Sequence, residues 1–200
     1  ELDAEDQALG VKTPGTKRPA PPKKKKRKLS GQEVSFNEPE PWETPVQGAE
    51  LADTIKATFE EFLFLPEHAS TVLTLWVFHT YEFDQFAVTP YQLVTSPEPG
   101  CGKSSLVVLV AHLVRNALPA SNATTASIFR LIGASHPTLL IDEADTYLPG
   151  NPELRGILNS GHMKATAFIL RCVGDDQEVR KFSTWCPKLI ASITRGKSRI

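Results

Sequence analysis

The chain has 200 residues, of which 40% are hydrophobic and 22% charged, and its formal net charge is −1 at pH 7. This length is enough for a buried core, but the near-zero charge excludes a protein that binds nucleic acid through basic charge over its whole surface. No apolar run approaches the ~20 residues of a membrane-spanning helix, and the acidic start lacks a signal-peptide pattern. We therefore expect a cytoplasmic protein that has no contact with a membrane.

Residues 1–50 are predicted to form a disordered tail or linker, because they are rich in Pro, Lys, Glu and Gly and lack any helical or strand period. Six consecutive basic residues follow two prolines in this segment: Lys23, Lys24, Lys25, Lys26, Arg27 and Lys28. Three interpretations of this run stay open. It is a solvated linker, a tail that binds DNA or RNA phosphates, or a nuclear localisation signal.

Residues 51–90 are predicted to form a helical N-terminal segment. In the first helix Ile55, Phe59 and Phe62 recur at helical spacing, and Pro66 ends it. The second helix spans about 67–81 and is apolar enough to be largely buried.

Residues 91–200 are predicted to form an α/β core with a parallel sheet. A strand over 91–95, a Gly-containing loop over 96–102 and a helix over 103–116 come in the order that a phosphate-binding loop requires. The elements expected after them are a helix over 125–133 capped by Thr124 or Thr125, a buried strand over 138–141, a helix over 152–159 capped by Asn151, a β-hairpin over 167–184, and a buried strand over 188–193.

The loop and the start of its helix contain the strongest chemical signal. In a P-loop, backbone N–H groups surround the phosphates of ATP, a lysine reaches their oxygens and the next hydroxyl binds Mg²⁺. The strict pattern has a glycine where this chain has Pro97, so the match is incomplete. A structural turn is the alternative. The predicted nucleotide contacts are Glu98, Pro99, Gly100, Cys101, Gly102, Lys103, Ser104 and Ser105.

A second signal is the apolar run 139–141, which ends in Asp142 and Glu143. As a Walker B strand it is expected to lie next to the loop strand. Asp142 then holds Mg²⁺ together with Ser104, and Glu143 polarises the attacking water, so that Glu143 and Lys103 are the predicted catalytic residues. A helix-capping acidic pair is the alternative. Residues 142–145 spell D-E-A-D, but the helicase class with that signature needs a second RecA-like domain, for which the chain has no room.

Hydrolysis also requires side chains that sense the γ-phosphate. Ser192 on the last strand and Asn159 on the preceding helix are the sensor candidates. Arg155 and Arg171 are candidates for an arginine finger acting across a subunit interface, with ordinary surface arginines as the alternative.

The three cysteines, Cys101, Cys172 and Cys186, contain no CxxC pair. Their odd number and wide spacing favour free thiols over a disulfide framework or a zinc site. We expect them to be buried.

From about residue 62 to 193 the chain resembles a bacterial and phage family of P-loop domains of unknown function that are joined to primase-like modules. The shared pieces are Leu65-Pro66-Glu67, residues 75–80, 96–105, 139–145 and 153–162, Val173-Gly174-Asp175-Asp176, and residues 182–187. The resemblance implies an ASCE-type, AAA+-like or superfamily 3-like ATPase, a helicase-like motor in DNA replication or mobile-element maintenance. It also implies contact with DNA, a primase or replication protein, and further copies of the chain.

In such motors a hairpin before the last core strand faces DNA, which makes Arg180 and Lys181 candidates for backbone contact. An ordinary solvated hairpin is the alternative. Members of the family continue past the last strand with an arginine and a helical lid, whereas this sequence stops at Ile200. We therefore expect a C-terminally truncated copy. A nucleotide-dependent adaptor that does not translocate, or a hydrolysis-deficient copy, are the alternatives to a motor.

Overall fold

The computed structural model describes residues 34–36, 40–120, 123–174 and 176–193. The fold belongs to the compact unit that begins at Phe36. The basic run at 23–28 lies outside the described residues. Helix α1 (Gly48–Phe62) begins inside the range predicted as a tail, so that prediction is wrong for its last three positions.

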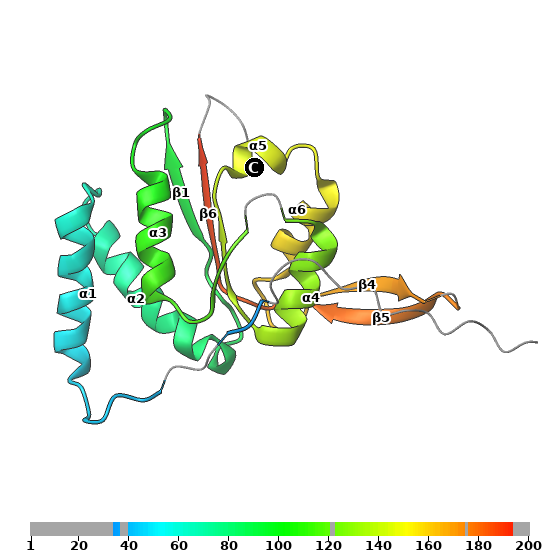
Figure 1. Ribbon diagram of the computed structural model, residues 1–200, viewed down its shortest axis with the longest axis horizontal. Coiled ribbons are helices and arrows are strands. Elements are labelled where there is room, and N and C mark those ends of the chain that lie inside the picture. The colour runs from blue at the N-terminus through cyan, green and yellow to red at the C-terminus, as the bar shows by residue number, and fades with distance from the viewer. Residues whose placement is uncertain (1–33, 37–39, 121–122, 175, 194–200) are drawn as a thin grey trace, which may run out of the picture. The chain divides into compact units, whose positions relative to one another are not determined.

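The centre of the unit is a parallel sheet in the order β1-β6-β3-β2, formed by β1 (Gln92–Ser96), β6 (Lys188–Ile193), β3 (Thr138–Ile141) and β2 (Ala117–Pro119) (Figure 1). The prediction of an α/β fold with a parallel sheet is confirmed. The prediction that the strand ending at Asp142 lies next to the loop strand is wrong, because β6 lies between them. The first five residues of β6 are buried, as expected for a strand with neighbours on both sides.

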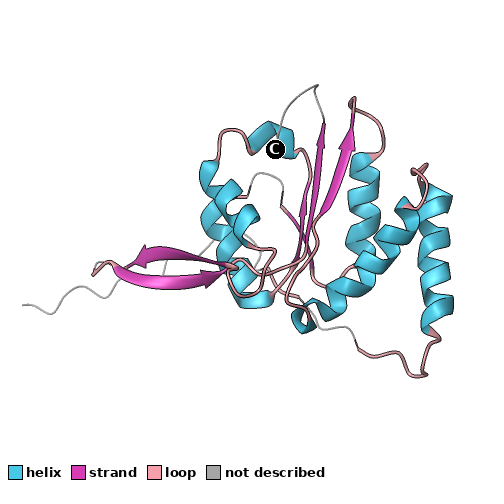
Figure 2. Ribbon diagram, turned by 180° about the vertical axis from the view of Figure 1, so that it is seen from behind, coloured by secondary structure: helices cyan, strands magenta, loops and turns pink. Residues whose placement is uncertain are grey.

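Helices cover both faces of this sheet (Figures 1 and 2). Helices α1, α2 (Ala69–Glu82) and α3 (Lys103–Leu113) share an apolar cluster with Leu140 and Leu189. Helices α4 (Thr125–Ser135) and α6 (Pro152–Ser160) share the other cluster with Leu139 and Ile190. Successive side chains of a strand point to opposite faces, which is why neighbouring residues join different clusters.

The alternation of faces follows from the path of the chain. The connection from β1 through α3 to β2 crosses the sheet in one direction, and the connection through α4 to β3 returns in the other. Crossovers between parallel strands are almost always right-handed, so reversing the direction requires the second helix to pack on the opposite face.

Two predicted helix caps are confirmed. The Thr124 hydroxyl accepts the backbone N–H of Ser127 at 3.2 Å, and the Asn151 side chain accepts that of Leu154 at 3.0 Å. Each bond satisfies an N–H group that has no partner within its helix.

Three short elements were not predicted: β2, the 3-10 helix η1 (Phe83–Gln85) and helix α5 (Ala144–Tyr147). β2 has three residues and ends in Pro119, which a strand tolerates only at a sheet edge because proline has no N–H to donate. Two predicted boundaries also shift, since α2 begins at Ala69 and α3 ends at Leu113.

The predicted hairpin is present as β4 (Phe168–Val173) paired antiparallel with β5 (Glu178–Ser183). It is separate from the central sheet and projects from it (Figure 1). Phe182 packs against Phe129 of α4 with ring centroids 4.8 Å apart, so the base of the hairpin is anchored while its tip extends outward. Among the described helices, none has the length and apolar character needed to cross a membrane.

Candidate functional site

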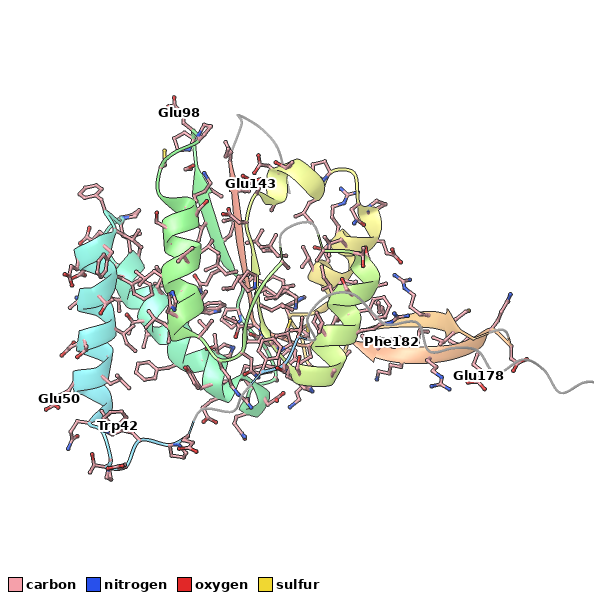
Figure 3. The ribbon with its side chains drawn as sticks, viewed as in Figure 1. Trp42, Glu50, Glu98, Glu143, Glu178 and Phe182 are labelled. Atoms are coloured by element: carbon pink, nitrogen blue, oxygen red, sulfur yellow. The ribbon has the colours of Figure 1, made fainter. Side chains whose placement is uncertain are left out.

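Three chain segments meet at the carboxyl edge of the central sheet. They are the loop 97–102 after β1, the acidic pair Asp142–Glu143 after β3, and the end of β6. Figure 3 shows Glu98 and Glu143 at this same end of the molecule. Open α/β sheets bind their ligands at the carboxyl ends of the strands, so this edge is the place to look for a site.

The loop folds back on itself through two glycines. Gly100 and Gly102 have φ values of 78° and 80°, a left-handed conformation that other residues rarely adopt. The buried hydroxyl of Ser96 supports the loop from below: it donates to the carbonyl oxygen of Glu98 at 2.7 Å and accepts from the Lys103 ammonium at 2.5 Å. Ser96 was not among the predicted site residues, although a hydroxyl residue that ends the strand before a Gly-containing loop is a signal for one.

Helix α3 begins with N–H groups that no side chain caps. Its N-cap is Gly102, which has no side chain to offer an acceptor. The N–H groups of Lys103, Ser104 and Ser105 precede the first bond within the helix, which Leu106 makes to Gly102. These groups lie next to a mostly exposed loop, and a helix end of this kind attracts anions through its dipole.

The two chemical motifs meet directly. The Ser104 hydroxyl donates to Oδ2 of Asp142 at 2.7 Å, although the two residues are 38 positions apart. The other carboxylate oxygen of Asp142 accepts the backbone N–H of Glu143 at 2.8 Å. The structure therefore brings together the hydroxyl and the carboxylate that the sequence predicts as the Mg²⁺ site.

These oxygens fit Mg²⁺, which prefers oxygen ligands and takes most of them from phosphates and water. The described part of the chain contains no cluster of three or more His, Cys, Asp or Glu side chains able to hold a metal. A hydroxyl and one carboxylate supply only part of the octahedral set of oxygen ligands that Mg²⁺ takes.

Glu143 has an unusual backbone. Its φ and ψ are 53° and 39°, in the left-handed region, which costs a non-glycine residue about 1–2 kcal/mol. It occupies the N-cap position of α5, but no side chain caps that helix. The capping alternative for the acidic pair is therefore not supported at Glu143, whose exposed side chain lies at the sheet edge without a hydrogen bond or ion pair to another described residue.

Of the two sensor candidates, the structure brings only Ser192 to this edge. Ser192 is buried on β6 and pairs in register with Thr95 of β1. Next to it, the N–H of Ile193 donates to the carboxylate of Asp145 at 2.9 Å. Because β6 lies between β1 and β3, its end lies between the end of the loop strand and the end of the strand that precedes the acidic pair.

Asn159 lies at the opposite edge. Helix α6 runs back across the sheet, and the carbonyl oxygen of Leu158 near its end accepts the hydroxyl of Tyr91, which precedes β1. β6 has six residues, so its two ends, and with them the two edges of the sheet, lie about 16 Å apart at the rise of a β-strand. Asn159 is therefore removed from the candidate site, and the direction of α6 is the physical reason.

The hairpin cations are engaged within the hairpin. Arg180 donates to the Glu178 carboxylate at 2.8 Å, and the Lys181 ammonium lies 4.0 Å from the centre of the Phe168 ring. Figure 3 shows Glu178 toward the hairpin tip and Phe182 toward its base. The two candidate DNA contacts are therefore on a hairpin that projects away from the three segments at the carboxyl edge.

The two candidate arginine fingers differ in their contacts. Arg171 on β4 forms an ion pair with Glu153 of α6, whereas Arg155 is exposed on α6. Of the three cysteines, all free, only Cys186 is buried. The prediction of burial is wrong for Cys101 and Cys172, because one lies on the exposed loop and the other on the outer face of the hairpin.

The amino edge of the sheet contains a buried polar cluster that the sequence did not reveal. The fully buried Lys188 ammonium donates to the carbonyl oxygens of Thr184 and Cys186 at 2.9 and 3.0 Å and lies 4.8 Å from the Tyr91 ring centre. Burial lowers the pKa of Lys188 and raises those of Cys186 and Tyr91. Gly161 lies against this cluster, with no room for a side chain.

Comparison with known proteins adds no relative from which a role could be inferred. No protein-family model matches the sequence, and no curated protein matches it either.

Proposed function

We propose that this chain is a P-loop NTPase of the ASCE type that binds Mg·ATP at the carboxyl edge of its sheet and hydrolyses it. The observation that carries the proposal is the 2.7 Å hydrogen bond between Ser104 and Asp142. Ser104 belongs to the loop motif and Asp142 to the acidic pair, and both motifs are interpreted as parts of a phosphate site. Two unrelated motifs would not be expected to lie in contact.

The proposed roles follow from the positions of the groups. The free N–H groups at the start of α3 bind phosphate oxygens. The Lys103 ammonium donates a hydrogen bond to the Ser96 hydroxyl in this structure. Its side chain is flexible, so it can donate to a phosphate oxygen in the loop instead. Ser104 and Asp142 hold Mg²⁺, which supplies charge neutralisation at the phosphates when bound. Glu143 accepts a hydrogen bond from the attacking water and orients it.

The test is Mg·ATP binding and hydrolysis by the wild type and by Lys103→Ala and Glu143→Gln. Lys103→Ala removes a charge-assisted contact worth about 1.5–3 kcal/mol, or about ten- to hundred-fold in Kd. Glu143→Gln is expected to bind normally and to lose turnover. Lys56→Ala is the matched control, because Lys56 is a surface lysine paired with Glu60 on α1. Equal binding by wild type and Lys103→Ala would refute the assignment of the loop.

For the biological role we propose a helicase-like motor that acts on DNA, with a primase or replication protein and further copies of the chain as its partners. One observation favours a second candidate, an adaptor that binds nucleotide without translocating. The hairpin cations that a motor would direct at DNA are occupied by Glu178 and Phe168. Turnover with and without single-stranded DNA separates the two: stimulation that Arg180→Ala and Lys181→Ala reduce supports the motor, and unstimulated turnover supports the adaptor.

A further inference from the structure

The end of β6 is held by different partners on its two sides. On one side β1 pairs with it to the last residue, Ser96 opposite Ile193. On the other side β3 stops at Ile141, opposite Ile190. The last three residues of β6 therefore extend past their second neighbour, and a backbone N–H that points to that side has no strand to receive it.

Asp145 supplies the missing acceptor. Its Oδ1 accepts the N–H of Ile193 at 2.9 Å, from a position 48 residues away in the sequence. Asp145 lies in the first turn of α5, two residues after Glu143, and that turn is closed by a bond from the N–H of Thr146 to the carbonyl oxygen of Glu143 at 2.9 Å. One carboxylate thus joins the turn that follows the acidic pair to the end of the central strand.

Resting on the proposed ATPase function, we propose that Asp145 is a positioning residue for hydrolysis. It holds the end of β6 beside the turn that carries Glu143, and so fixes Ser192, the residue before Ile193, on the strand between the loop strand and the acidic pair. The role requires an acceptor oxygen aimed at the N–H of Ile193, and a negative charge is not needed. Phosphate binding is left to groups on the other side of β6, namely the loop and the start of α3.

The test compares Asp145→Ala, which removes the acceptor, with Asp145→Asn, which keeps an oxygen at the same position. We expect Asp145→Ala to lower kcat about ten- to hundred-fold, the range that a misplaced catalytic group produces, with the Kd for Mg·ATP unchanged within about threefold. Asp145→Asn is expected to restore kcat to within about threefold of wild type. Asp53→Ala, at an exposed position on α1, is the matched control.

Ser192→Ala supplies the second arm. If Asp145 acts through Ser192, removing the hydroxyl lowers kcat in the wild type and has little further effect in Asp145→Ala, so the two losses are not additive. Wild-type turnover by Asp145→Ala, an equal loss in Asp145→Asn, or fully additive losses would each overturn the proposal.

Amide hydrogen exchange at Ile193 separates this inference from the proposed function. The N–H of Ile193 is expected to be protected in wild type and Asp145→Asn and to exchange faster in Asp145→Ala, whether or not the chain hydrolyses ATP. Absence of ATP binding with this exchange pattern intact would refute the ATPase proposal and leave the contact standing. Unchanged exchange in Asp145→Ala would refute the contact itself.

Discussion

Gly161→Ala is a substitution for which the structure predicts a large loss of stability. A Cβ on Gly161 would lie well under 3.0 Å from the Lys188 ammonium and from the carbonyl oxygen of Thr184, and 3.0 Å from the Tyr91 hydroxyl. The ammonium ends a flexible chain and can move. The Thr184 oxygen belongs to the backbone that leads into β6, so it cannot move without shifting the strand.

The expected cost has two parts. Adding a methyl group to a close-packed interior costs about 1–3 kcal/mol. Moving Lys188 away from the Thr184 and Cys186 carbonyl oxygens leaves a buried donor without its partners, at about 1–3 kcal/mol more. Together they amount to about 2–6 kcal/mol, a large share of the roughly 5–15 kcal/mol that stabilises a typical domain.

Urea unfolding followed by tryptophan fluorescence measures this loss, because Trp76 and Trp185 are buried. Gly156→Ala is the matched control: Gly156 lies inside α6 with nothing within 4 Å of its added Cβ, so alanine there should stabilise by about 0.5–1 kcal/mol. A free energy of unfolding for Gly161→Ala within about 0.5 kcal/mol of wild type would refute the reasoning.

The remaining predictions concern the loop, pH and backbone strain. A maleimide should label Cys101 and Cys172 but not the buried Cys186, and Mg·ATP should slow labelling at Cys101 alone, as peptide mass spectrometry can measure. Burial lowers the pKa of His79, so between that lowered pKa and the ordinary 6.5 the unfolded chain binds more protons than the folded one. The free energy of unfolding should therefore fall as the pH drops below about 6.5, and it should fall less steeply in His79→Gln. Urea midpoints at pH 7 and 5 measure both slopes. Glu143→Asn should gain about 0.5–1 kcal/mol in thermal unfolding, since asparagine tolerates left-handed backbone, while ATP turnover is lost.

The parts of the fold that sequence could predict are those with local causes. The apolar run 138–141, the caps Thr124 and Asn151, and the turn between β4 and β5 each depend on residues close together in the chain. The strand, loop and helix around Lys103 form a unit of the same kind. In each case, propensity and tertiary packing favour the same local structure.

The parts that could not be predicted depend on pairing between distant segments. Nothing near Lys188 indicates that its strand inserts between β1 and β3, and nothing near Asp145 indicates that it reaches Ile193. The same holds for Gly161, whose need to be glycine comes from Thr184 and Lys188. Asn159 was misplaced because the hydrophobic pattern of a helix gives its buried face but not which of its ends lies near a given edge of the sheet.

The central position of β6 has a consequence for how the chain acquires its structure. β6 is the last of the described strands in chain order, yet both β1 and β3 pair with it and not with each other. Synthesis proceeds from the N-terminus at about 5–20 residues per second. The loop strand β1 and the strand β3 that precedes the acidic pair cannot form a continuous sheet until residues 188–193 have been synthesised. Chains that end before residue 188 should therefore contain separate helix–strand units with exposed apolar strand edges. During synthesis such units should need chaperones until residues 188–193 are available to pair with β1 and β3.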